Sequence, residues 1–145
     1  MFFQSNYALQ QQLTHVKTSV LGIGGTGFTL KLAKGAFAPN PDSDPTTFTE
    51  CDFTGYAAET QTTMTGISQT GNSFESSSDT VLSFAPTGTT VGNTCTGYWM
   101  EDSAGHLLGF ETISPGVPMM GPLDALDIVP RWQAQPANWP NTILP

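Results

Sequence analysis

The stretch from residue 95 to residue 113 reads CTGYWMEDSAGHLLGFETI and decides the fold class. Two apolar, aromatic-rich runs flank the polar sequence DSAG at residues 102–105, in which the aspartate starts a type I turn and the glycine takes the positive-φ position. Before the turn, Tyr98 and Met100 alternate with Trp99, and this period of two is the signature of a strand. The stretch therefore predicts a β-hairpin at the centre of an antiparallel sheet.

The rest of the chain has the composition of a single all-β domain. Its 145 residues are enough to bury one real core. Only 11% of the residues are charged, against roughly 25% in typical soluble proteins, while glycine and proline are frequent. Short runs separated by turn signals predict an antiparallel β-sandwich or small barrel of about six or seven strands, with an arm at each end.

The charge balance excludes two classes of partner. Twelve acidic residues against four basic ones give a net charge of −8. This charge repels phosphate backbones and anionic lipid, so we expect no direct nucleic-acid binding and no membrane binding. No stretch approaches the roughly 20 apolar residues of a membrane span, and no signal peptide is recognisable. We therefore expect synthesis in the cytoplasm.

Residues 1–27 are predicted to form an N-terminal arm. Leu9, Leu13 and Val16 recur at helical spacing, but so short a helix must dock either on its own sheet or on a neighbouring subunit. The glycine-rich residues 22–27 fit the GxGxxG spacing of dinucleotide-binding loops. That motif needs a strand before it, whereas a helical pattern precedes it here, so these residues are interpreted as a flexible hinge.

Residues 28–130 are predicted to form the β-sandwich body, and residues 131–145 an extended, proline-rich C-terminal arm. In the body, Phe28, Leu30 and Leu32 should face the core. The tryptophans could pack in the core, at an interface, or as a platform on which sugars stack. An intersubunit pocket is the natural hypothesis for the tryptophan at 139. The candidate partner-interface residues of the two arms are Leu9, Leu13, Val16, Trp132, Trp139, Ile143 and Leu144.

Residues able to do acid–base chemistry are few. His15 and His106 are the only candidates for a base at neutral pH, and neither has the neighbours of a metal site or a serine nucleophile elbow. The carboxylates of Glu101 with Asp102, or of Asp124 with Asp127, would have to meet across a cleft to hydrolyse a glycoside. We therefore predict that the protein is not an enzyme.

Metal and disulfide chemistry are also not expected. Asp42 and Asp44 lie in a polar loop but lack the ligand spacing of an EF-hand, so the loop is interpreted as solvated. Cys51 and Cys95 each lie in or beside an apolar run, and two buried free thiols are favoured over a bridge. No cofactor and no metal are predicted.

Two patches of the sequence resemble a group of small proteins encoded in tailed-phage genomes. They are TECDFTGY at residues 49–56 and the hairpin sequence YWMEDSAG at residues 98–105. The likeness runs from about Phe28 to Val129 and leaves both arms outside. These phage proteins are generally treated as minor structural proteins of the virion, and no catalytic residue carries over from them.

The resemblance implies a non-enzymatic component of the virion. The first expectation is a capsid decoration, or cement, protein that stabilises the head by bridging subunits of the major capsid protein. The alternative is a tail or fibre component that binds a receptor or carbohydrate. The implied partners are the major capsid protein or other virion proteins, and a symmetric homo-oligomer is expected.

Overall fold

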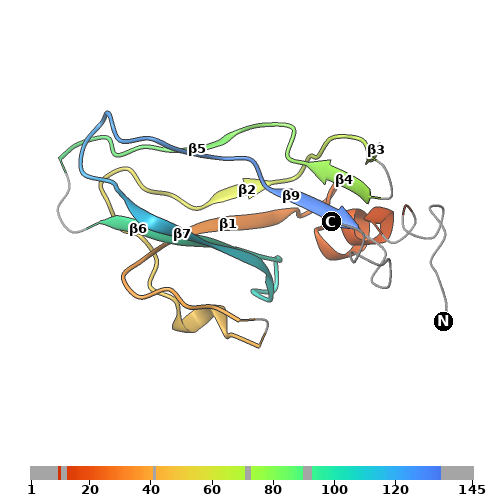
Figure 1. The fold of residues 1–145 in the computed structure, drawn as a ribbon, viewed down its shortest axis with the longest axis horizontal. Coiled ribbons are helices and arrows are strands. Elements are labelled where there is room, and N and C mark those ends of the chain that lie inside the picture. Colours follow the sequence, from red (N-terminus) through yellow and green to blue (C-terminus); the bar gives the residue numbers. More distant parts are fainter. Residues whose placement is uncertain (1–9, 11–12, 41, 71–72, 90–92, 135–145) are drawn as a thin grey trace, which may run out of the picture.

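The computed structural model describes residues 10, 13–40, 42–70, 73–89 and 93–134 (Figure 1). All strand pairs are antiparallel and lie in two layers, which confirms the prediction of an all-β, sandwich-like fold; the sheets do not close into a barrel. The described residues form nine strands rather than six or seven: β1 (Phe28–Lys34), β2 (Glu59–Gln61), β3 (Ser68–Thr70), β4 (Ser73–Ser77), β5 (Leu82–Phe84), β6 (Thr94–Glu101), β7 (Leu107–Pro118), β8 (Leu126–Ile128) and β9 (Arg131–Ala134).

The larger sheet has the strand order β2-β1-β6-β7. In β1, Phe28, Leu30 and Leu32 are buried on one face, as their alternation predicts. Each such side chain contributes roughly 1.5–3 kcal/mol when it is removed from water. Leu30 lies opposite Met100 of β6, and Lys31 lies opposite Trp99. The register therefore places Met100 on the core face of the sheet and Trp99 on the outer face.

The second layer consists of two small sheets, β3-β4-β9 and β5-β8, which follow one another along the sandwich (Figure 1). Ser77 lies opposite Arg131 in the first, and Leu82 lies opposite Ile128 in the second. The buried Pro130 lies between β8 and β9 and has no N–H to donate, so strand pairing is interrupted there. Its carbonyl still accepts a hydrogen bond from the Ser78 amide at 2.9 Å.

One main core lies between the two layers. It combines residues of β1, β5, β6 and β8 with residues of the connecting segments, and no single element supplies most of it. Its buried members are Leu21, Phe28, Leu30, Leu32, Cys51, Phe53, Met64, Leu82, Phe84, Cys95, Met100, Met119 and Ile128. Both cysteines are therefore part of the core, where they are free thiols as the sequence predicts.

The N-terminal segment docks on its own body, which is one of the two placements that the sequence left open. Residues 13–15 are helical and continue into a short π-helix, η1 (Val16–Val20). Leu13 is only 2% exposed and packs against Phe74 of β4. The Lys17 ammonium donates hydrogen bonds to the carbonyls of Met64, at 3.3 Å, and Thr65, at 2.5 Å.

The glycine-rich residues 22–27 form a tight turn, whereas the sequence predicts a flexible hinge. The Gly24 amide donates to the Thr62 carbonyl at 3.0 Å, just beyond β2. Gly27 has φ +69°, and a Cβ placed there would lie 2.1 Å from the Gln61 carbonyl oxygen. These glycines are needed because the backbone bends sharply and approaches β2 closely, which no larger residue permits.

The body also continues beyond residue 130, where the sequence predicts the start of an extended arm. β9 pairs with β4, and the indole of Trp132 lies with its ring centroid 5.2 Å from that of Phe28. Pairing satisfies the backbone of β9, and the contact with the core removes apolar surface from water. Residues 135–145 lie outside the described part of the chain.

Candidate partner-binding edge

The structure brings three of the seven candidate interface residues into the protein's own packing. Leu13 lies in a small cluster with Phe74, and Val16 packs against the main core. Trp132 contacts both clusters and is half-buried. The other four candidates lie outside the described residues: Leu9, Trp139, Ile143 and Leu144. Leu13, Val16 and Trp132 therefore contribute to the fold, and a partner-binding surface must be sought among other described residues.

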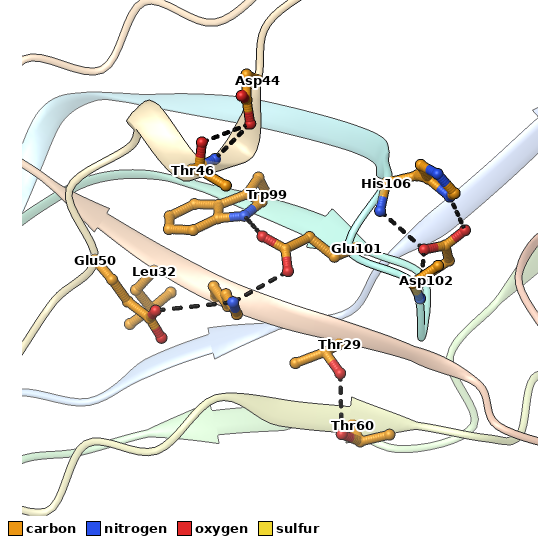
Figure 2. Close-up of polar contacts among 12 residues, drawn as sticks. Thr29, Leu32, Asp44, Thr46, Glu50, Thr60, Trp99, Glu101, Asp102 and His106 are labelled. Atoms are coloured by element: carbon orange, nitrogen blue, oxygen red, sulfur yellow. Dashed lines mark hydrogen bonds and ion pairs between the residues drawn. The ribbon is translucent and has the colours of Figure 1, made fainter.

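The turn between β6 and β7 is built on Asp102, as the sequence predicts. Its Oδ1 accepts hydrogen bonds from the amides of Ala104, at 2.9 Å, and His106, at 2.8 Å (Figure 2). Its Oδ2 lies 2.7 Å from Nδ1 of His106, and Gly105 takes a φ of +85°. The hydrogen bonds from the backbone and side chain of His106 hold the pKa of Asp102 below its usual value.

A polar network lies on the outer face of the larger sheet. The Trp99 indole Nε1 donates to Oε1 of Glu101 at 2.6 Å, and Oε2 of Glu101 lies 3.0 Å from the Lys31 ammonium (Figure 2). The ammonium of Lys31 is also 4.0 Å from Glu50. Glu101, predicted as a member of a carboxylate pair, thus orients Trp99 and pairs with Lys31.

Tyr56 connects this network to the backbone of β1. Its hydroxyl donates to Oε1 of Glu50 at 2.7 Å and accepts the Leu32 amide at 3.0 Å. Burial, together with the hydrogen bond to Glu50, raises the pKa of Tyr56. The phenol therefore stays neutral and links the Glu50 side chain to the backbone of β1.

The segment around η2 (Pro45–Thr47) covers the outer face of the sheet (Figure 1). Phe37 and Phe48 flank this segment, and their ring centroids lie 6.2 Å and 5.2 Å from that of Trp99. Trp99 is only 2% exposed as a result. Asp44 caps η2 by accepting the amide and hydroxyl of Thr46, at 2.9 Å and 2.8 Å.

The remaining predicted carboxylates have separate structural partners. Asp124 accepts the amides of Met120 and Gly121, both at 2.9 Å, whereas Asp127 accepts the Ser83 hydroxyl at 2.6 Å. Among the described residues, no group of three or more His, Cys, Asp and Glu residues is placed to hold a metal ion.

The surface feature best suited to binding is the outer edge of β7. β7 is the last strand in the order β2-β1-β6-β7, and within the described chain no strand pairs with its other side. An open hollow of about 260 Å³ lies beside its first residues and is lined by Leu107, Leu108, Gly109 and Phe110. We call residues 107–113 the β7 open edge, since they precede Pro115 and Pro118.

The sequence places this hairpin at the centre of the sheet, and that prediction is wrong for its second strand. β6 is indeed interior, because it pairs with both β1 and β7. β7 is an edge strand, and the sequence carries a signal for this: Pro115 and Pro118 cannot donate to a strand on either side. β7 nevertheless continues through both prolines and ends at Pro118.

None of the described helices is long and apolar enough to cross a membrane. No family model, curated protein or solved structure matches this chain.

Proposed function

We propose that this protein is a non-enzymatic structural component of a tailed-phage virion, a capsid decoration protein that binds the major capsid protein through the β7 open edge. The virion assignment is supported by the resemblance of residues 49–56 and 98–105 to small phage structural proteins. The binding mode is supported by one observation: the outer edge of β7, beside an apolar hollow, pairs with no strand of the described residues.

The β7 open edge suits binding by strand addition. An unpaired edge offers a row of N–H and C=O groups that a further extended segment can pair with. Seven residues at roughly 3.4 Å each give an edge of about 24 Å, which is long enough for specific pairing. Pro115 and Pro118 confine the partner to the first half of β7, because proline has no amide hydrogen.

The chemistry of the edge favours burial against another protein. Glu111 is the only charged residue of β7, in a chain whose net charge is −8. Burying this edge therefore removes few charged groups from water. The unfavourable free energy of desolvating charge, which opposes the formation of many interfaces, is small here. The hollow beside Leu107 and Phe110 can accept a large apolar side chain of an extended capsid segment.

The alternative, a tail or fibre component that binds carbohydrate, would use an exposed aromatic platform. Among the described residues, the exposed large apolar side chains are Val81, Met120, Leu123 and Val129, and none of them is aromatic. Trp99 lies under the η2 segment and Trp132 packs against the core. These placements favour the decoration protein, in which a symmetric homo-oligomer would bridge neighbouring capsid subunits.

Quantitative mass spectrometry of gradient-purified virions tests the assignment. A decoration protein repeats over the capsid lattice, so hundreds of copies per particle are expected. A handful of copies would instead favour the tail or fibre component. Absence of the protein from the particles would contradict both assignments.

A further inference from the structure

A lysine and two carboxylates meet on the outer face of the larger sheet, and the proposed function does not use them. The Lys31 ammonium of β1 lies 3.0 Å from Oε2 of Glu101, the last residue of β6, and 4.0 Å from Oε2 of Glu50 (Figure 2). The side chain of Glu101 is only 13% exposed and that of Lys31 is 27% exposed. An amine, an acceptor carboxyl and a second carboxyl are the groups that condensation of a lysine with a glutamate requires.

Each carboxylate is oriented by a donor of its own. The Trp99 indole Nε1 donates to Oε1 of Glu101 at 2.6 Å, so it is Oε2 that approaches the ammonium. The Tyr56 hydroxyl donates to Oε1 of Glu50 at 2.7 Å, and again Oε2 is the oxygen nearest the ammonium. The three groups are therefore held in one arrangement, and such positioning is the condition for a fast intramolecular reaction.

Aromatic side chains shield the acceptor from water. Trp99 is 2% exposed, and the centroid of its ring lies 6.0 Å from the Lys31 ammonium and 5.2 Å from the ring centroid of Phe48. Keeping an ammonium and a carboxylate partly out of water is unfavourable, whereas an amide carries no net charge. This environment therefore favours a neutral amide over the ion pair.

We propose that Lys31 and Glu101 condense in the folded protein into an isopeptide bond that links β1 to β6. Nζ of Lys31 forms a bond with Cδ of Glu101, and the bond between Cδ and Oε2 breaks. Nζ loses two protons, and both end on Oε2, which leaves as water. The ammonium and the carboxylate supply every atom, so the step needs no oxidant, reductant or other reactant. This inference is independent of the proposed function.

Two neighbouring groups assist the step. Glu50 accepts a proton from the ammonium, which gives an amine that can attack, and passes the proton on to Oε2 of Glu101. The indole N–H of Trp99 already lies on Oε1 of Glu101 and stabilises the negative charge that develops there in the tetrahedral intermediate. Because Nζ starts 3.0 Å from the leaving oxygen, proximity replaces the high reactant concentration that amide formation in water requires.

The bond would stabilise the fold. It would close a loop from residue 31 to residue 101, and closing so long a loop restricts the unfolded chain, as a disulfide does. Native geometry needs little change, because β1 and β6 are already paired, with Lys31 opposite Trp99. The linked protein should melt about 10 °C above the variant Lys31→Arg, which keeps the positive charge but has no amine to acylate.

Intact mass spectrometry of the full chain, folded and incubated at neutral pH, tests the proposal. The wild type should be lighter than its sequence by one water, and peptide mapping should find residues 31 and 101 joined. Lys31→Arg should have its full sequence mass. Glu50→Gln keeps an acceptor for the Tyr56 hydroxyl but loses the proton acceptor, so it should form the link at least tenfold more slowly. Circular dichroism checks that each protein is folded.

A folded wild type with the full sequence mass would overturn the proposal and leave an ordinary ion pair. A water loss that maps elsewhere, such as a succinimide at an aspartate, would do the same, and so would an equal water loss in Lys31→Arg. The measurement on the wild type decides the matter even if a variant does not fold. An equal rate of linkage in Glu50→Gln would overturn the role assigned to Glu50.

Discussion

The two edges of the larger sheet are built in opposite ways. At one edge, β2 is three residues long, and the Gly22–Gly27 turn lies against it, with the Gly24 amide donating to the Thr62 carbonyl. At the other edge, β7 is twelve residues long and has no described strand on its outer side. The β2 edge is thus short and covered, as in proteins that avoid edge-to-edge association. The β7 edge is long and is not covered by another strand of the described residues, which suits a strand that binds a partner.

The two edges also differ in how the neighbouring face is closed. On the outer face, Trp99 of β6 is covered by Phe37 and Phe48, and its indole is hydrogen-bonded to Glu101. Phe110, which lies opposite Trp99 on β7, is only half-buried. The outward-facing side chain of β6 is therefore better buried than the one opposite it on β7. Truncating the β6 side chain should lower the free energy of unfolding more than truncating the β7 side chain.

The largest expected effect comes from removing this cover at β6. Trp99→Ala should lower the free energy of unfolding by about 4 kcal/mol, because it leaves a cavity under Phe37 and Phe48 and removes the hydrogen bond from the indole to Glu101. Phe110→Ala should cost about 1–2 kcal/mol, because the residue is half-buried. Urea denaturation measures both, and equal losses would contradict the contrast between the strands.

The second effect comes from breaking the cover of the β2 edge. Gly27→Ala should lower the free energy of unfolding by about 3 kcal/mol, because its Cβ would meet the Gln61 carbonyl and its φ is positive. Gly24→Ala is the matched control: its φ is also positive, but nothing lies within 4 Å of the added Cβ. It should cost only about 1 kcal/mol. A hinge would tolerate both substitutions equally in the same denaturation experiment.

The third effect tests binding at the β7 open edge. Leu107→Lys places a charge beside the hollow and should weaken binding to decoration-free capsids at least tenfold, or about 1.4 kcal/mol. Leu123→Lys makes the same chemical change at a residue that is 98% exposed and should bind normally. Co-sedimentation with capsids measures binding, and circular dichroism checks that both variants are folded. Normal binding of Leu107→Lys would count against the β7 open edge.

The smallest effect concerns the turn that leads into β7. The pKa of Asp102 is lowered in the folded state, so its ionised form stabilises the turn above the unfolded pKa of about 4. This stabilisation is lost as the pH falls through the lower folded pKa. Asp102→Asn removes the titration. The difference in melting temperature between wild type and variant should therefore shrink between about pH 5 and pH 2, and a constant difference would exclude this role.

Local patterns in the sequence were sufficient for the parts of the fold that depend on neighbouring residues. β1 has the predicted inward-facing residues, and the 102–105 turn has the predicted aspartate and positive-φ glycine. β4 was missed because it is rich in serine. Ser76 is buried, but its hydroxyl donates to the Thr65 carbonyl at 2.8 Å, and such a long-range partner is not visible in the hydrophobic pattern.

The candidate site depends on strand order, which local patterns do not determine. The hairpin of β6 and β7 is predictable from its local sequence pattern. β7 is an edge strand because the other side of β6 pairs with β1, and the local pattern does not show that long-range pairing. For the same reason, the glycine run was interpreted as a hinge, since its contact with Gln61 comes from a segment more than thirty residues away.

Hydrogen exchange of the full chain, free and bound to decoration-free capsids, tests the central claim most directly. In the free protein, outward-facing amides of residues 107–113 should exchange faster than those of the interior strand β6. Binding should slow exchange in residues 107–113 and leave β2 and the Gly22–Gly27 turn unchanged. Unchanged exchange at residues 107–113, with protection elsewhere on bound protein, would show that the β7 open edge is not the binding surface.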